Sequence, residues 1–93
     1  MFIPSTFELG GLTWTVKFVK KFPDKLVQGE CDIVTTTIKV KSTLSQEMKE
    51  QTFCHELVHA IKFAMGIAEQ DHNEVDVDAF AMYLHQFLKT AKW

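Results

Sequence analysis

The segment Ser45–Gly66, SQEMKEQTFCHELVHAIKFAMG, carries the strongest structural signal in the chain. Ser45 is a good helix N-cap, and the acidic residue at position 47 suits the positive end of a helix dipole. Gly66 is of the type at which helices often end. Between these ends, apolar residues recur at spacings of three and four: Phe53, Leu57, Ala60, Ile61 and Ala64. This period predicts a helix with one apolar stripe that faces a core.

The sequence before this helix has the period of β-strands. In Thr13–Phe18 every second residue is apolar, which predicts a strand with one buried side. Further along, we expect a short strand near Glu30–Ile33, a turn through the threonines, and a strand near Thr37–Lys41. A continuous strand through the threonines is the alternative, because β-branched residues favour strands.

A polar linker at residues 68–73 leads into a second predicted helix, Asn73–Leu88. We expect its apolar residues to supply its buried surface: Val75, Ala79, Phe80, Met82, Tyr83, Phe87 and Leu88. Three strands followed by two helices is an α+β pattern. The sequence therefore predicts a small three-stranded, mostly antiparallel sheet packed on two helices.

Length and composition bound the class of protein. The 93 residues, 46% of them hydrophobic, predict a single domain, 1–93, with a core of its own. A formal net charge of −2 gives no broad electrostatic reason to expect nucleic-acid binding. No apolar run approaches membrane-spanning length, and the first residues lack the pattern of a secretory signal. We therefore expect a cytoplasmic protein with no membrane partner, in which Cys31 and Cys54 stay reduced. The sequence leaves the oligomeric state open.

The predicted helix contains the pattern H-E-x-x-H, with histidines at 55 and 59. Residues four apart on a helix project from the same face, so His55 and His59 can share one metal ion. Zinc accepts imidazole nitrogen at roughly 2.0–2.1 Å. Glu56 lies on a neighbouring face, from which its carboxylate can reach a metal-bound water. These residue types at this spacing predict a zinc site with Glu56 as the general base.

A catalytic zinc needs a third protein ligand, and the second helix offers Glu74. Asp71, Asp76 and Asp78 are its rivals for this position. The pattern resembles that of the gluzincin metallopeptidases, whose H-E-x-x-H is followed on a later helix by a Glu ligand, often with an Asp four residues beyond. Glu74 and Asp78 match that spacing. The resemblance implies zinc held by the two histidines and Glu74, with Asp78 orienting His55.

More narrowly, residues 29–88 resemble the small ImmA/IrrE-like peptidases and minimal gluzincins, a group that includes phage proteins. The resemblance implies a peptide or protein substrate, and hydrolysis by a zinc-activated water. It also implies that Ile38, Lys39 and Val40 form an edge strand that binds the substrate through its backbone. The chain departs from the family in two ways. Only fourteen residues, 60–73, separate His59 from Glu74, and no tyrosine or histidine is evident for stabilising the oxyanion.

Other interpretations remain for the same residues. The two histidines can be ordinary surface groups, and Glu74 can be an acidic residue that favours the start of its helix. His72 precedes that helix, where a lone loop histidine is more often exposed to solvent. His85 lies on the Glu74 face but about 16 Å along the axis, which excludes it as a ligand. At the level of function, the alternatives are a zinc-stabilised peptide-binding or protein-binding module without turnover, and a metal-free regulatory protein.

Overall fold

Four strands form one mixed sheet in the order β1-β2-β4-β3. The computed structural model describes residues 1–93, and the strands are β1 Thr6–Leu9, β2 Leu12–Val19, β3 Gly29–Asp32 and β4 Thr37–Lys41. β1 pairs with β2 and β3 with β4 in antiparallel fashion, whereas the central pair β2 and β4 is parallel. The α+β class is confirmed. The sheet has four strands, not the predicted three, and its central pair is parallel although we expected a mostly antiparallel sheet.

The strand missing from the prediction is β1. Gly10 and Gly11 both have positive φ, 57° and 85°, and they form the two-residue turn that joins β1 to β2. Such a turn needs positive φ at both central residues, which glycine adopts without steric cost. The predicted turn between β3 and β4 is present at residues 33–36, where the Asp32 side chain accepts a hydrogen bond from the backbone of Val34 at 2.9 Å.

The expectation that Ile38, Lys39 and Val40 form the edge strand is wrong. These residues belong to β4, which lies between β2 and β3 and is paired on both sides. Ile38 and Val40 are completely buried. The free edges of the sheet are β1 and β3. After β2 the chain forms β3 at the edge of the sheet and then returns to form β4 between β2 and β3.

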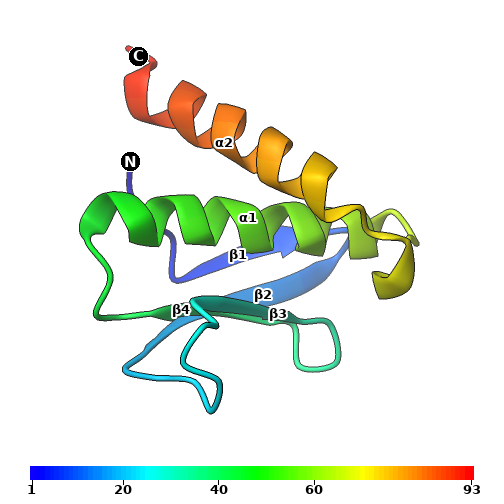
Figure 1. The fold of residues 1–93 in the computed structure, drawn as a ribbon. Coiled ribbons are helices and arrows are strands. Elements are labelled where there is room, and N and C mark those ends of the chain that lie inside the picture. Colours follow the sequence, from blue (N-terminus) through cyan, green and yellow to red (C-terminus); the bar gives the residue numbers. More distant parts are fainter.

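The helices form two further layers on one face of the sheet (Figure 1). α1, Gln46–Ala64, lies on the sheet, and α2, Glu74–Thr90, lies on α1 rather than beside it. We expected both helices to pack on the sheet; instead α1 is enclosed from two sides. A short 3-10 turn, η1 Glu69–Asp71, connects them. Neither helix combines the length and apolar character needed to cross a membrane.

The core lies on both sides of α1. Trp14 and Ile38 come from the sheet, and Val77 and Ala81 from α2. The predicted buried face of α2 is therefore wrong, since six of its seven residues are exposed: Val75, Ala79, Phe80, Met82, Tyr83 and Phe87. The α1-facing side of α2 instead carries small apolar residues and the polar residues described below.

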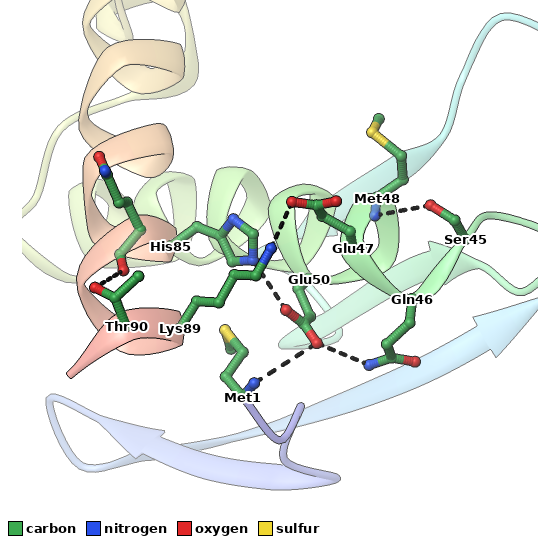
Figure 2. Close-up of polar contacts among 10 residues, drawn as sticks. Met1, Ser45, Gln46, Glu47, Met48, Glu50, His85, Lys89 and Thr90 are labelled. Atoms are coloured by element: carbon green, nitrogen blue, oxygen red, sulfur yellow. Dashed lines mark hydrogen bonds and ion pairs between the residues drawn. The ribbon is translucent and has the colours of Figure 1, made fainter. Parts of the chain in front are cut away.

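A polar cluster around the buried Glu50 and His85 joins the two helices near the start of α1 (Figure 2). We call this cluster the far end, because it lies at the opposite end of the helix pair from the histidines at 55 and 59. His85 Nε2 lies 2.9 Å from Glu50 Oε1, and Gln46 donates to the other Glu50 oxygen at 3.1 Å. The amino group of Met1 lies 3.7 Å from that second oxygen. Because the C-terminal part of α2 meets the N-terminal part of α1 here, the two helices run antiparallel. Ser45 caps α1 at this end, as predicted, with its hydroxyl accepting from Met48 N at 3.2 Å.

Candidate metal centre

At the other end of the helix pair, His55, His59 and Glu74 converge. His55 Nε2 lies 3.4 Å from one Glu74 oxygen, and His59 Nε2 lies 3.0 Å from the other. Each residue offers one ligand atom within 4.8 Å of the other two. The three side chains thus converge from two helices, as the predicted zinc site requires, whereas zinc binding itself stays a prediction.

Local structure explains why Glu74 reaches the histidines. The Asn73 side chain caps α2 by accepting from Val75 N at 2.9 Å and Asp76 N at 3.2 Å. This cap makes Glu74 the first residue of the helix, next to the end of the connection from α1. Glu74 shares its face of α2 with Ala81 and His85, at spacings of seven and eleven residues, and that face lies on α1.

Asp78 contacts the ring nitrogen of His55 that points away from Glu74. Its Oδ1 lies 2.8 Å from His55 Nδ1, as the predicted orienting role requires. The negative charge of this carboxylate favours a proton on the nearer ring nitrogen, Nδ1. The Nε2 atom of the neutral ring is then unprotonated, and its lone pair faces Glu74. Asp78 thereby favours the tautomer in which His55 can bind a metal ion.

The second histidine is supported differently. His59 Nδ1 lies 2.7 Å from Nδ1 of His72, and the two rings lie edge to edge with an interplanar angle of 16°. His72 is half-buried, not the exposed loop residue that the sequence led us to expect. Burial is the main cause that lowers the pKa of His59, and the negative charge of Glu74 opposes it. The neutral form of His59 is therefore favoured by its surroundings.

The three residues fit zinc by the chemistry of their donors. Two imidazole nitrogens and one carboxylate oxygen are a ligand set of catalytic zinc sites, and tetrahedral coordination at about 2.1 Å separates ligand atoms by about 3.4 Å. The contacts of 3.0 and 3.4 Å are close to that spacing. The Glu74 side chain is 64% exposed, so solvent reaches the site from one side. A fourth position for water or substrate is thus sterically available.

Glu56 points from α1 into a cleft beside this cluster. The cleft has a volume of about 490 Å³ and is lined by the segment leading into β3, by α1 and by α2, with His55 and Asp78 among its walls. Burial, with smaller contributions from the charges of Glu74 and Glu30, raises the pKa of Glu56 to about 8. A cation at the cluster would act in the opposite direction, because positive charge favours the carboxylate.

Gly29 brings β3 close to Glu56. A Cβ atom at this position would lie 2.5 Å from Thr52 Cγ2 and 3.1 Å from Glu56 Oε2. Only glycine permits this approach of strand and helix without displacing the glutamate. Sequence reasoning missed Gly29 and His72. A glycine at the start of a predicted strand was the one available signal for the first; a contact between His59 and His72 has no sequence signal.

The remaining candidates lie elsewhere. Asp71 and Asp76 are not part of the convergent group, and His85 belongs to the far end. Tyr83, expected in the core, is exposed on the outer face of α2, and Trp93 contacts Phe87 there. The thiols of Cys31 and Cys54 are free, and burial raises their pKa values to about 12 and 11, so both stay protonated.

Comparison with known proteins adds no relative: the chain matches no protein-family model, no curated protein and no solved structure. The functional argument therefore depends on the geometry of the site alone.

Proposed function

We propose that this protein is a zinc-dependent peptidase of the gluzincin kind, in which His55, His59 and Glu74 bind the metal and Glu56 is the general base. The observation that carries the proposal is the meeting of three acceptor atoms, from two helices, within 4.8 Å of one another. Three acceptors without a donor between them repel, so a cation in their midst is the stabilising arrangement. Glu56 lies in the wall of the adjoining cleft.

When bound, zinc supplies Lewis-acid chemistry, polarising a carbonyl group and making water a nucleophile near neutral pH. Glu56 accepts the proton from that water as it attacks, and then delivers the proton to the leaving amine. Its place in the wall of the cleft beside His55 suits this role, because a general base must reach the proton that it accepts. Asp78 keeps the His55 ring oriented throughout.

We assign substrate binding to the free edge of β3 instead of β4. Lys41 donates to the carbonyl of Gln28 at 2.9 Å, and Gly29 lies opposite Val40. In antiparallel pairing, hydrogen-bonded and outward-facing residues alternate, so the backbone groups of Gly29 and Cys31 face away from β4. Gly29 also lines the cleft that contains Glu56. An extended peptide paired with this edge would bring a carbonyl group near the metal centre.

The test combines zinc stoichiometry with cleavage of a denatured-protein and peptide mixture. Wild-type protein should bind one zinc ion and cleave. Glu74→Gln should lose zinc, whereas Asp76→Asn should keep it, although both residues lie in the first turn of α2 and affect its dipole alike. Equal zinc binding by these two variants would show that Glu74 is only a helix-start residue.

Glu56→Gln separates catalysis from metal binding in the same experiment. This variant should retain zinc and lose cleavage by at least about 100-fold, because general-base catalysis contributes roughly 10²–10⁴-fold. Full activity of Glu56→Gln would contradict the mechanism.

A second candidate function is a zinc-stabilised module that binds peptides without cleaving them. The specific observation in its favour is that no free tyrosine or histidine is placed to stabilise an oxyanion: Tyr83 is on the outer face of α2, and His72 and His85 have other partners. Stoichiometric zinc and peptide binding by wild-type protein, with no cleavage of any substrate, would support this function over hydrolysis.

A further inference from the structure

We propose that His72 is a positioning residue that holds His59 in the tautomer with its proton on Nδ1 and its free Nε2 directed at the metal. This inference rests on the proposed function, since it concerns how one of the proposed zinc ligands is prepared. The contacts that carry it are the hydrogen bond between His59 and His72 and a second one from His72 to the backbone.

The positions of the protons follow from the acceptor at the end of this chain of hydrogen bonds. His72 Nε2 lies 3.0 Å from the carbonyl oxygen of Ile67. A carbonyl oxygen can only accept, so the proton of His72 is on Nε2 and its Nδ1 is an acceptor in the neutral ring. The bond of 2.7 Å between the two Nδ1 atoms then requires His59 to donate. His59 Nε2, 3.0 Å from Glu74, is left without a proton.

The Ile67 carbonyl, at the end of this chain of hydrogen bonds, is held in place by the C-terminal end of α1. Gly66, with φ of 83°, donates to Phe63 O at 2.9 Å, and Ile67 N donates to Lys62 O at 3.0 Å. These two bonds form a Schellman motif, a rigid ending that glycine in the left-handed conformation makes possible. The C-terminal cap of α1 therefore fixes the Ile67 carbonyl that accepts from His72, and His72 in turn accepts from His59 of the same helix.

Packing fixes the His72 ring in this position. The ring lies edge to edge with that of His59, with an interplanar angle of 16°, and it also packs against Phe63 at a centroid distance of 4.6 Å. The backbone N–H of His72 donates to Glu69 O at 3.0 Å, at the end of η1. Backbone and ring are both held, so the hydrogen bond to His59 exists before any metal arrives.

The two proposed histidine ligands are thus prepared by different groups. Nδ1 of His55 faces a carboxylate, Asp78, whereas Nδ1 of His59 donates to a neutral imidazole. A carboxylate acceptor beside His59 would add a further negative charge to those of Glu74 and Asp78. A neutral acceptor fixes the same tautomer without that charge.

The test uses the full chain without metal and reads the ring nitrogens of His59 by ¹⁵N NMR at a pH where imidazole is neutral. Wild-type His59 should be protonated on Nδ1. His72→Asn should preserve this tautomer, because the asparagine oxygen takes a place similar to that of Nδ1. His72→Phe keeps an aromatic ring beside Phe63 but removes the acceptor, so His59 should change to a mixture of tautomers.

Zinc affinity, measured by competition with a chelator, provides the second measurement. His72→Phe should weaken binding about 10- to 100-fold, the usual effect of removing a partner of a histidine ligand. His72→Asn should stay within a few-fold of wild type. An Nε2-protonated His59 in the wild-type protein, or equal affinities of the two variants, would overturn the inference. Failure of wild-type protein to bind zinc would instead overturn the proposed function, since the tautomer is read without metal.

Discussion

The two ends of the α1–α2 interface use the same residue types in opposite ways. At the far end the carboxylate comes from α1 and the imidazole from α2: Glu50 and His85. At the metal centre the imidazoles come from α1 and the carboxylate from α2: His55, His59 and Glu74. Both sets lie on the facing sides of the same two helices.

The difference between the ends is the balance of donors and acceptors. Glu50 receives His85, Gln46 and the amino group of Met1, so a single carboxylate is surrounded by donors and is buried with its partner. At the metal centre each histidine directs its N–H away, toward Asp78 or His72, and leaves acceptor atoms facing Glu74. A histidine beside a carboxylate is thus part of a donor-rich buried cluster in one place and of the proposed cation site in the other.

Removing the carboxylate of the far end should have the largest effect on stability. Glu50→Ala leaves His85 buried without its partner and should lower the free energy of unfolding by about 3–5 kcal/mol. The metal centre of the folded variant should bind zinc as before. Urea denaturation of the metal-free protein measures the first quantity, and chelator competition the second.

Glu47→Ala is the matched control, because Glu47 is exposed and pairs with Lys89 at 2.6 Å one turn from Glu50 (Figure 2). Exposed ion pairs contribute little to stability, so the free energy of unfolding of Glu47→Ala should stay close to that of wild type. If the two variants are equally stable, or if a folded Glu50→Ala protein no longer binds zinc, the two ends are not the separate devices described here.

The local part of this arrangement could be predicted from the sequence. Whether His55 and His59 share a face depends only on the helix, and the cap at Asn73 determines where Glu74 begins α2. The connection of residues 60–73 is short enough to bring the start of α2 back to α1. These features need information from near neighbours, and the sequence supplied it.

Features that depend on distant pairings could not be predicted. β4 is central because β3 pairs on its outer side, and nothing within Thr37–Lys41 distinguishes an edge strand from a buried one. For the same reason the cleft-side edge was assigned to the wrong strand. The contact between His59 and His72 depends on the path of the connection, which residue types alone do not determine.

The orientation of α2 failed for a different reason. Its largest apolar side chains, such as Phe80 and Phe87, are 63% and 57% exposed, while Val77 and Ala81 are buried. Small residues allow α2 to approach α1 closely, and the polar residues of both ends must share that same face. Predicting that the most apolar face of a helix is buried therefore selects the wrong face of α2, the one that is exposed.

Removing Asp78 should have an intermediate effect, and on zinc instead of the fold. Asp78→Ala deletes the acceptor that orients His55, and zinc affinity should fall about 10- to 100-fold. The Asp78 side chain is 68% exposed, so the free energy of unfolding of the metal-free protein should change by less than about 0.5 kcal/mol. This is the reverse of the Glu50→Ala pattern. Unchanged zinc affinity would mean that the carboxylate does not prepare His55.

Lowering the pH should affect the two ends at different pH values, and the change in stability at the far end should be the smallest of the effects described here. The hydrogen bond from His85 is the main cause that lowers the pKa of Glu50 below its ordinary value of 4.5. A lowered pKa means that Glu50 stabilises the fold above pH 4.5, and that this contribution is lost as the pH falls through the lower value. Glu50→Gln removes the titrating group, so the difference in the free energy of unfolding between this variant and wild type should narrow below pH 4.5.

Zinc should already be released at higher pH, because the histidine ligands must be unprotonated. Urea denaturation of metal-free wild type and Glu50→Gln from pH 7 to 3, beside zinc retention over the same range, measures both transitions. A constant difference between the two proteins would remove Glu50 as the acid-sensitive group of the far end.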